Sequence, residues 1–419
     1  MANNFDSNFT RKLAKSFVAG FESERNISKD VNTQLLDGKF APDTGDTTDF
    51  KRPTDYRSVR TTNGDVSGET KSDIITGKAS GVVQDYFTVE VDYDEADEAI
   101  KMDQLDELLK PAARRIVTDL ELDFASFAMK NAGLLSGTVG TAVSAWSDVA
   151  NAAATMDATG VPSGDLCYVV NPYTQITLAG DQRGLGGENG NMTANQQATI
   201  TSNFAGMKVK TSTALASYTT GTGADRTGTL SSTPTATYVS AKDSMTQTLA
   251  VTGFQANLVV AAGEKITIAG RNRLNLSTRT PILDAAGNEV LFSGTVVASV
   301  TLDGSGAGNL VVTGPAIYEA NGQYNTVDSA PTSGDVVTLG GAASTLIQPN
   351  LFFHKEAFAI GSVPIKKLYS TDTVATTEDG LQIRVSKGAS FSENKNLVRF
   401  DLRPAYSVLN PFFAGHGFG

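Results

Sequence analysis

The chain has 419 residues, 40% of them apolar, which is enough for two or three domains with hydrophobic cores of their own. Its formal net charge is -11, so a chain-wide surface for binding polyanions is excluded, and any contact with nucleic acid is expected to be local and weak. Two histidines and one cysteine, far apart in sequence, leave almost no material for zinc centres or Cys–His nucleophiles. We therefore expect no metal, no cofactor and no catalytic residues.

The N-terminal sequence lacks the basic and apolar segments of a leader peptide, and no apolar window approaches the ~20 residues needed to cross a bilayer. We expect a chain that is made and used in the cytoplasm, without a membrane partner. The single cysteine, Cys167, lies in an apolar run typical of a buried strand, so it is expected to be a core thiol.

The first part of the chain, residues 1–43, contains one amphipathic stretch. Apolar residues recur at every fourth position from Phe9 to Phe21, which predicts a helix with one buried face. Its other side carries Arg11, Lys12 and Lys15. Such a basic face usually lies in solvent, and the alternative is contact with a neighbouring chain or with nucleic acid.

Residues 44–93 have a different character, because glycines separate short polar stretches with strand patterns. The pattern predicts a long two-stranded excursion. A ribbon of this kind has no apolar face large enough to be stable by itself, since an isolated hairpin is marginal in water. We expect it to lie against another subunit.

The strongest helical pattern runs from Pro111 to about Asn131, with apolar residues every fourth position and Gly133 as the stop. A proline near the start of a helix costs little, because the first N–H groups have no partner in the helix. At 1.5 Å per residue the helix would span roughly 30 Å. An acidic run precedes it: Asp92, Asp94, Glu95, Asp97 and Glu98.

Helix and strand patterns alternate over residues 146–219, which indicates an α+β or α/β domain. The expected helices are Trp146–Met156 and Pro172–Ala179, and the expected strands are Asp165–Val170 and Met207–Thr211. A glycine-rich segment at residues 184–190 lacks the preceding strand and the following Lys-Ser/Thr of a phosphate-binding loop, so a flexible surface loop is favoured over nucleotide binding.

From about residue 220 to 345 the sequence becomes rich in Thr, Ser, Gly and Val, with turn clusters between strand-sized pieces. This spacing predicts a small all-β barrel or sandwich inserted into the preceding domain. The expected strands are Thr246–Thr252, Lys265–Ala269, Val296–Leu302, Leu310–Val312 and Val336–Leu339. The turn at Asp303 resembles part of a calcium loop but lacks the bidentate glutamate, so a plain hairpin turn is favoured.

The C-terminal part, residues 346–419, resumes the interrupted domain with short strands and no catalytic cluster. The expected strands are Leu351–Ile360, Leu381–Val385 and Val398–Leu402.

Short segments along most of the chain resemble, in the same order, the coat proteins of short-tailed lambdoid bacteriophages of the Salmonella and Shigella podovirus group. They read FKRP, GKA, EAIK, RIVTDLE, WSDVA, PNLF and RFDL, at residues 50–53, 77–79, 98–101, 115–121, 146–150, 349–352 and 399–402. They are matches of sequence and carry no catalytic signature.

The resemblance implies the tailed-phage capsid fold named after phage Hong Kong ninety-seven. This is an α+β fold with a long spine helix, an extended β-hairpin loop and, in this branch, an inserted all-β domain. On this basis we expect an N-terminal arm (1–43), an extended loop (44–93), a peripheral domain with the spine helix (94–145), an axial domain (146–219 and 346–380) interrupted by the β-barrel-like insertion (220–345), and C-terminal peripheral strands (381–419).

The resemblance also implies a structural function, that of a major capsid protein. Copies of the chain would form the hexamers and pentamers of an icosahedral head around a double-stranded DNA genome, assembled in the bacterial host cytoplasm and retained in the virion. Implied partners are other copies, a scaffolding protein, a portal protein and, weakly and without specificity, the packaged DNA. Some phages with this fold crosslink neighbours through a lysine; Lys51, Lys71 and Lys78 lie on the loop here, but no partner pair matches, so no crosslink is expected.

Arginines on the extended loop suggest a subunit interface. We hypothesise that they meet the acidic run of a neighbouring copy, although exposed charges are usually only solvated. The residues concerned are Arg52, Arg57 and Arg60 on one side and Asp94, Glu95, Asp97 and Glu98 on the other.

Three other functions deserve comparison with a capsid protein. An encapsulin-like compartment shell has the same fold, but such chains are generally shorter and lack a large β insertion. A secreted β-rich fibre or adhesin would match the Thr- and Gly-rich middle, but it would not match the missing leader or the long helix. A hydrolase is disfavoured by the scarcity of histidine and the absence of a Gly-x-Ser-x-Gly elbow.

Overall fold

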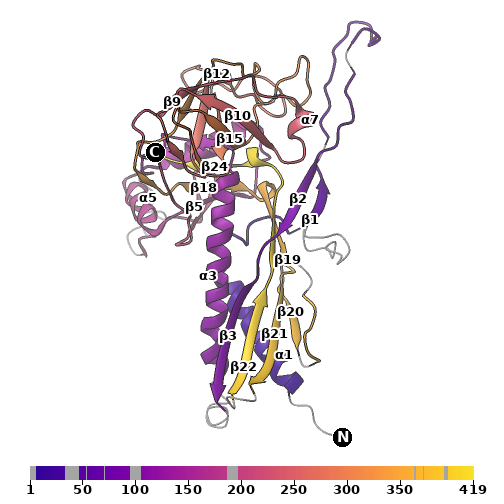
Figure 1. Cartoon of the computed structure of the whole chain (residues 1–419), viewed down its shortest axis with the longest axis vertical. Helices are drawn as coiled ribbons and strands as arrows, with labels where there is room; N and C mark the ends of the chain where they lie inside the picture. The colour runs from indigo at the N-terminus through magenta and orange to yellow at the C-terminus, as the bar shows by residue number, and fades with distance from the viewer. Residues whose placement is uncertain are drawn as a thin grey trace. The chain divides into compact units, whose positions relative to one another are not determined.

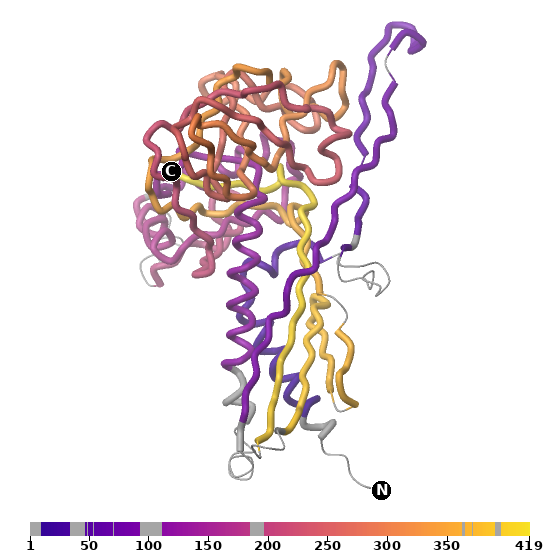
Figure 2. Tube along the Cα trace, viewed as in Figure 1, coloured from indigo at the N-terminus to yellow at the C-terminus, as the bar shows by residue number. Residues whose placement is uncertain are grey.

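The computed structural model describes residues 6–33, 47–52, 54–69, 71–94, 105–185, 197–362, 365–370, 372–390 and 395–419 (Figures 1 and 2). The chain divides into two compact units, which are treated separately below. Unit 1 comprises Met1–Asp49, Ser80–Ala125 and Phe358–Ser407, and unit 2 comprises Phe50–Ala79, Ser126–Ala357 and Val408–Gly419.

Unit 1 contains a four-stranded antiparallel sheet covered by a helix. The sheet has the order β20 (Thr373–Thr376), β21 (Gln382–Ser390), β22 (Lys395–Leu402), β3 (Phe87–Asp94), and the helix is α1 (Asp6–Glu24). Alternate residues of β22, among them Phe400, are fully buried, as a half-buried strand requires. The ring of Phe17 on α1 stacks on that of Phe400 with centroids 4.4 Å apart. The amphipathic helix predicted at residues 9–21 is therefore confirmed.

A second sheet has the order β1 (Thr47–Lys51), β2 (Lys78–Val83), β23 (Pro404–Val408), β19 (Phe358–Ser362). Its first two strands are the ends of the extended loop. Residues 87–94, whose greater part the sequence assigns to that loop, instead form β3 and pair along their whole length with β22.

The longest helix, α3 (Leu105–Asn131), confirms the strongest helical prediction but begins earlier than expected. Pro111 lies inside the helix and not in its first turn. It therefore removes one internal hydrogen bond of the helix. The prediction that Pro111 costs the helix little stability is wrong, because it assumed that the helix begins near this residue.

Glu121, in the middle of α3, binds the turn that follows α1. Its buried carboxylate accepts hydrogen bonds from the backbone amides of Ile27 (2.7 Å) and Ser28 (3.1 Å) and from the Ser28 hydroxyl. Arg25, in the same turn, forms an ion pair with Asp379 at 2.7 Å. The N-terminal segment is thus fixed within unit 1 by a carboxylate that holds backbone groups.

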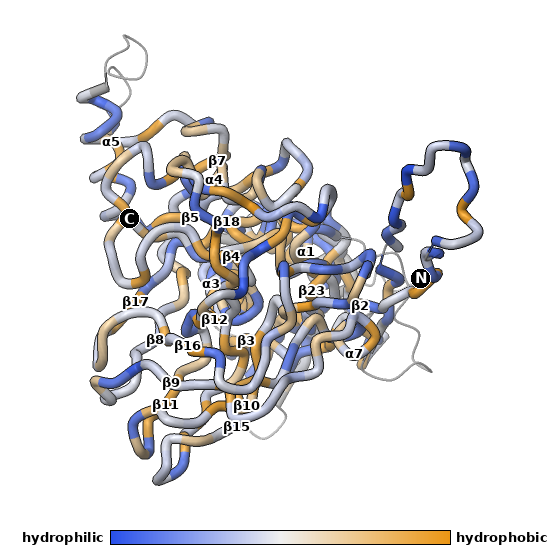
Figure 3. Tube along the Cα trace, turned by 90° about the horizontal axis from the view of Figure 1, so that it is seen from above, coloured by the Kyte–Doolittle hydropathy of each residue, from blue (hydrophilic) through white to orange (hydrophobic). Residues whose placement is uncertain are grey.

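Unit 2 is built on a six-stranded mixed sheet and two helices. The strand order is β4 (Leu134–Ser136), β24 (Ala414–Gly417), β18 (Asn350–His354), β5 (Leu166–Val170), β7 (Met207–Thr211), β6 (Asn203–Phe204), and the helices are α4 (Trp146–Thr159) and α5 (Pro172–Leu185). Every residue of β5 and β18 is buried, including Cys167. Figure 3 shows hydrophobic residues gathered along these strands.

A closed antiparallel barrel completes unit 2. Its strands follow the order β10 (Thr246–Thr252), β15 (Gly308–Thr313), β13 (Leu291–Val296), β12 (Lys265–Asn272), β16 (Val336–Leu339), β9 (Thr227–Leu230). The segments entering and leaving the barrel pair with each other as β8 (Tyr218–Thr219) and β17 (Leu346–Ile347). The remaining short elements are α7 (Tyr238–Ala241), β11 (Val259–Val260), β14 (Val300–Thr301), η2 (Lys355–Ala357) and η3 (Pro411–Phe413).

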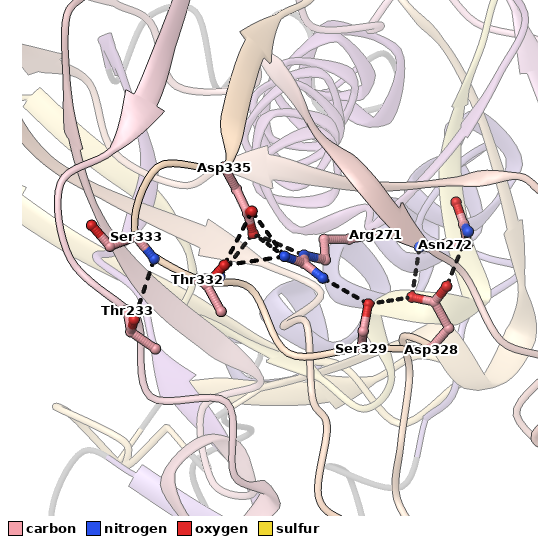
Figure 4. A network of polar contacts seen from close by, with 8 residues as sticks. All are labelled: Thr233, Arg271, Asn272, Asp328, Ser329, Thr332, Ser333 and Asp335. Atoms are coloured by element: carbon pink, nitrogen blue, oxygen red, sulfur yellow. Dashed lines mark hydrogen bonds and ion pairs between the residues drawn. The ribbon is translucent and has the colours of Figure 1, made fainter.

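One polar network orders a long connection of the barrel (Figure 4). Arg271 forms a bidentate ion pair with Asp335, with both nitrogen–oxygen distances 2.8 Å, and also donates to Ser329. Asp328 accepts hydrogen bonds from both the amide and the side chain of Asn272. The segment before β16, residues 328–335, has few apolar side chains. Charge-assisted hydrogen bonds hold it in place.

Several predicted elements coincide with the structure, and others do not. The strands at Thr246–Thr252, Met207–Thr211 and Val336–Leu339 are confirmed. The strand predicted at Val296–Leu302 is wrong, because Val296 ends β13 and only Val300–Thr301 pairs again. The single strand predicted at Leu351–Ile360 is two strands separated by η2. Both errors come from apolar runs that continue through a turn.

Replacing Glu121 by alanine should lower the free energy of unfolding by about 1–3 kcal/mol, because buried donors of Ile27 and Ser28 lose their acceptor. Urea denaturation monitored by circular dichroism, together with the rate of tryptic cleavage near Lys29, measures the effect. Asp119→Ala on the same helix is the matched control, since among the described residues Asp119 pairs with the exposed Arg115 at the helix surface. A loss no larger than that of the control would contradict the role of Glu121.

Candidate functional site

The extended loop connects β1 and β2 (Figure 2). Residues 50–79 of it belong to unit 2. Beyond the two strands, the described residues between Thr54 and Gly77 form no strand. The loop is therefore a β-hairpin only at its root. Its order depends on contacts with other parts of unit 2.

Arg52 is buried at the root of the loop. Its guanidinium donates to the backbone carbonyls of Lys78 (3.2 Å), Val408 (3.0 Å) and Leu409, while its own amide donates to the carbonyl of Gly77 (2.8 Å). Burial lowers the pKa of Arg52 to about 10, which leaves the group charged at neutral pH. Arg52 thus joins the two ends of the loop to the segment before η3.

The loop continues along the barrel through Asp55. The carboxylate of Asp55 forms an ion pair with Arg279, whose guanidinium also donates to the carbonyl of Asn325 at 2.8 Å. The Tyr324 hydroxyl accepts a hydrogen bond from the Asp55 amide (3.2 Å) and donates to the Ile75 carbonyl (3.1 Å). One tyrosine hydroxyl therefore connects both arms of the loop.

The returning arm contacts the turn at α7. A Cβ at Gly77 would lie 2.4 Å from the carbonyl oxygen of Lys242, so only glycine fits this close approach. The next amide, that of Lys78, donates to the carboxylate of Asp243 at 3.1 Å. The close approach at Gly77 and the hydrogen bond to Asp243 thus hold the returning arm against the same turn.

A small apolar cluster lies beneath these polar contacts. The rings of Tyr238 and Tyr324 stack with centroids 3.7 Å apart, and Ile75 from the loop packs against them together with Ala241 and Ile317. Stacked aromatic pairs of this kind add about 0.5–1.5 kcal/mol beyond the area that they bury. The root of the loop therefore has both an apolar and a polar attachment to the barrel.

The distal half of the loop is different. The hydrogen bonds of residues 58–69, among the parts of the chain that the structure describes, join only members of this stretch. Large apolar side chains along the loop are exposed: Tyr56 at 58%, Val66 at 47% and Ile74 at 76%. Hydrogen bonds from Ser67 lower the pKa of Asp65 and shape the tip into a turn.

The predicted interface residues have different fates. Arg57 is exposed and donates to the carbonyl of Asn321 at 3.3 Å, and Arg60 is exposed with no partner among the described residues. Arg52, in contrast, is committed to carbonyls of its own chain. Asp94 ends β3 opposite Lys395, whereas Glu95, Asp97 and Glu98 lie outside the described residues.

The side chains that bind the loop were not found from the sequence. Asp55 and Arg279 are separated by 224 positions, and no spacing rule links them. Tyr324 and Tyr238 lie in turn-rich stretches without periodicity. The one local signal is Gly77, a glycine directly before a strand, which often marks a close backbone approach.

Residue types used in catalysis are placed as core groups. Cys167, His354 and His416 are all buried, and burial lowers the pKa of both histidines. No three or more His, Cys, Asp or Glu residues among the described ones are arranged to hold a metal ion. In the described part of the chain, no helix has both the length and the apolar character needed to span a bilayer.

Comparison with known proteins gives the family. The model of the family described as P22 coat protein, gene protein 5, matches residues 1–419. The chain belongs to the P22 coat protein family. It is 36% identical over 423 residues, covering 100% of both chains, to a major capsid protein of Acyrthosiphon pisum secondary endosymbiont phage 1.

Solved structures that are similar to this coat protein come from other phages. One from Mycobacterium phage Che8 has a TM-score of 0.46 at 10% identity and covers 94% of this chain and 89% of that one. The capsid of cyanophage P-SCSP1u has a TM-score of 0.41 at 11% identity, with 89% and 83% covered.

Membership of the family confirms the main predictions. The coat protein is a phage major capsid protein, which is structural and not an enzyme. The predicted fold class is also confirmed, as an α+β capsid fold with a long helix, an extended loop and an inserted all-β barrel. The family model that matches the chain is that of a phage coat protein, and not that of an encapsulin or a secreted fibre protein.

Tyr324→Phe should loosen the root of the loop, because it removes the hydroxyl shared by Asp55 and Ile75 and keeps the stack on Tyr238. The expected destabilisation is about 0.5–1.5 kcal/mol. Hydrogen exchange of peptides at residues 54–57 and 73–76 should rise several-fold, and exchange of β10 should not change. Tyr173→Phe on an exposed side chain is the control. Unchanged exchange at both loop arms would show that the hydroxyl does not hold them.

Proposed function

We propose that copies of this coat protein assemble into the hexamers and pentamers of an icosahedral phage head that encloses a double-stranded DNA genome. Assembly would take place in the cytoplasm of the bacterial host, and the protein would remain in the virion. Membership of the P22 coat protein family and the similarity to a phage major capsid protein over the whole chain support this proposal.

The observation that carries the proposal is the contrast between the two halves of the extended loop. Its root is fixed by buried and charged contacts, while its distal half bonds only with itself among the described residues. A loop without a core of its own is ordered only against another surface. A second copy of the chain supplies such a surface many times over in a shell, where modest contacts add up through multivalency.

Three further partners belong to the proposal. A scaffolding protein would direct assembly, a portal protein would occupy one vertex, and the inner face would touch packaged DNA weakly and without specificity. The family resemblance supports the first two. The net charge of -11 supports a weak contact with DNA, because phosphate binding needs concentrated basic groups.

For the subunit interface we propose that Arg57 and Arg60 meet the acidic run of a neighbouring copy. Both are exposed, which makes them accessible to a partner. Arg52 stays a weaker candidate for a direct ion pair, because its donors are already used within its own chain. The acidic partners remain Asp94, Glu95, Asp97 and Glu98.

Reversing both exposed charges, in Arg57→Glu with Arg60→Glu, should leave the subunit folded and block shell formation, because like charges would face each other at each loop contact. Negative-stain electron microscopy and sedimentation of the protein expressed with its scaffold would measure this. Adding Asp94→Lys and Glu95→Lys should restore at least part of the shell yield. Lys355→Glu, a reversal of an exposed charge on η2, is the control. Normal shells from the double reversal would end this interface hypothesis.

Mature shells should contain no covalent bond between subunits. Lys51, Lys71 and Lys78 lie on or beside the loop, but no matching acceptor pair is recognised in the sequence. Boiling shells in detergent should therefore return a single band at 43.9 kDa on a denaturing gel. A ladder of multiples of that mass would contradict the prediction.

A further inference from the structure

The C-terminal end of α3 lies in unit 2 and is closed by side chains from distant parts of the sequence. The last carbonyls of any helix have no partner inside the helix. Here the carbonyl of Met129 accepts from the Nε2 of His416 at 2.8 Å. The carbonyl of Ala132, directly after the helix, accepts from the Nζ of Lys265 at 2.7 Å and from the hydroxyl of Thr295.

The two donors to Ala132 come from neighbouring strands of the barrel. Lys265 on β12 and Thr295 on β13 lie directly opposite each other, and the Lys265 Nζ also donates to the Thr295 hydroxyl at 2.6 Å. Both residues have no exposed surface. A lysine, a threonine and one carbonyl oxygen thus form a closed triangle.

The alternation of the strands shows which side of the barrel faces the helix end. Ile266 and Phe292 belong to the apolar core of the barrel. Because successive side chains of a strand point to opposite faces, Lys265, Ser293 and Thr295 lie on the outer face. Outer positions of a barrel are usually wet, but these polar residues are buried and bond to the residues that end α3.

Lys265 forms no ion pair with any of the residues that the structure describes. The titratable groups that face it are Arg273, just after β12, and His416 on β24: burial and the charge of Arg273 lower the pKa of Lys265, and burial and the charge of Lys265 lower the pKa of His416. Burying a lysine without a carboxylate is costly, so its place needs another reason. The bond to the end of α3 supplies that reason, because a donor at this end also opposes the partial negative charge of the helix terminus.

We propose that Lys265, together with Thr295, is the C-terminal cap of α3 and that this cap makes the helix end and the inserted barrel one cooperative junction. Lys265 acts here as a positioning residue. It holds the carbonyl of Ala132, the residue directly after the helix, on the outer face of the barrel, so the helix end cannot fray while the barrel is folded.

The number of donors and acceptors fits an uncharged amine. A neutral lysine has two N–H groups, and two acceptors are present, the Ala132 carbonyl and the Thr295 hydroxyl. A third N–H of an ammonium group would have no acceptor among the described residues. Burial, and then the charge of Arg273, lower the pKa of Lys265 well below its ordinary value.

A double-mutant cycle on the full-length protein tests the cap. Lys265→Met and Thr295→Val each leave the Ala132 carbonyl with one donor, and the double variant leaves it with none. Hydrogen exchange of the peptide covering the last turn of α3 should rise about threefold in each single variant. In the double variant it should rise far more than the product of the two, at least thirtyfold, because the two donors share one acceptor.

Exchange at β9 and β10, the two barrel strands that pair with neither β12 nor β13, reports whether the variants still fold. Lys355→Met, which removes an exposed lysine from the same unit, is the control. A purely multiplicative effect, or an unchanged helix end in a folded double variant, would overturn the proposal. If the double variant does not fold, the single variants decide, since unchanged exchange in both would overturn the cap.

The pH dependence separates a cap from a merely space-filling residue. A lysine whose pKa is lowered in the folded state binds fewer protons there than in the unfolded chain, so stability rises with pH up to the unfolded pKa of about 10.4. The stability of the wild type relative to that of Lys265→Met should therefore increase as the pH rises toward 9.5, by up to tenfold in the folding equilibrium per pH unit. His416 and Arg273 are present in both proteins. A difference that stays flat with pH would rule out the uncharged amine, and with it the two-acceptor cap as described.

Discussion

The burial of one charged side chain, Arg52, at the root of the extended loop is the constraint on which the exposed part of this coat protein depends. Ordering the backbone costs about 1–2 kcal/mol per residue, and the loop has no core to offset that cost. Arg52 concentrates its bonds where the two arms separate, because its donors reach carbonyls on both the returning arm and the segment before η3. Once the root is fixed, Asp55 and Ile75 can both reach Tyr324 on the barrel.

Three buried ionisable side chains of this chain bond to backbone groups, whereas other buried groups, such as Arg226 with Glu264 and Arg384 with Asp401, form ion pairs. Arg52 and Lys265 donate to carbonyls, and Glu121 accepts from amides. A carboxylate partner would fix one side chain against another, whereas a backbone partner fixes the path of a chain segment. A buried donor or acceptor without its partner costs about 1–3 kcal/mol, so each of these bonds strongly disfavours any other path. Segments with little apolar surface are held in this way.

The sequence predicts the repeating parts of the structure well and the single contacts poorly. Periodicity located α1, most of α3 and several barrel strands, because burial of one face repeats at a fixed interval. The resemblance to phage coats predicted the fold class and the function. The root of the loop could not be predicted, since Arg52 and its partner Val408 are 356 positions apart. Charge alone suggested a partner in another subunit for Arg52, while the fold surrounds it with carbonyls of its own chain.

The distal half of the loop is polar, in contrast to the root, which is held by buried contacts. A long apolar ribbon on a free subunit would pair with any exposed edge and aggregate before a shell could form. This loop instead carries separated large apolar residues, such as Tyr56 and Val66, between charged and small ones. Each contact that it can make is therefore weak, and a stable assembly requires many of them at once. A firm root with a weakly binding tip favours closed assemblies over random association, because only a fixed geometry allows all the weak contacts to form together.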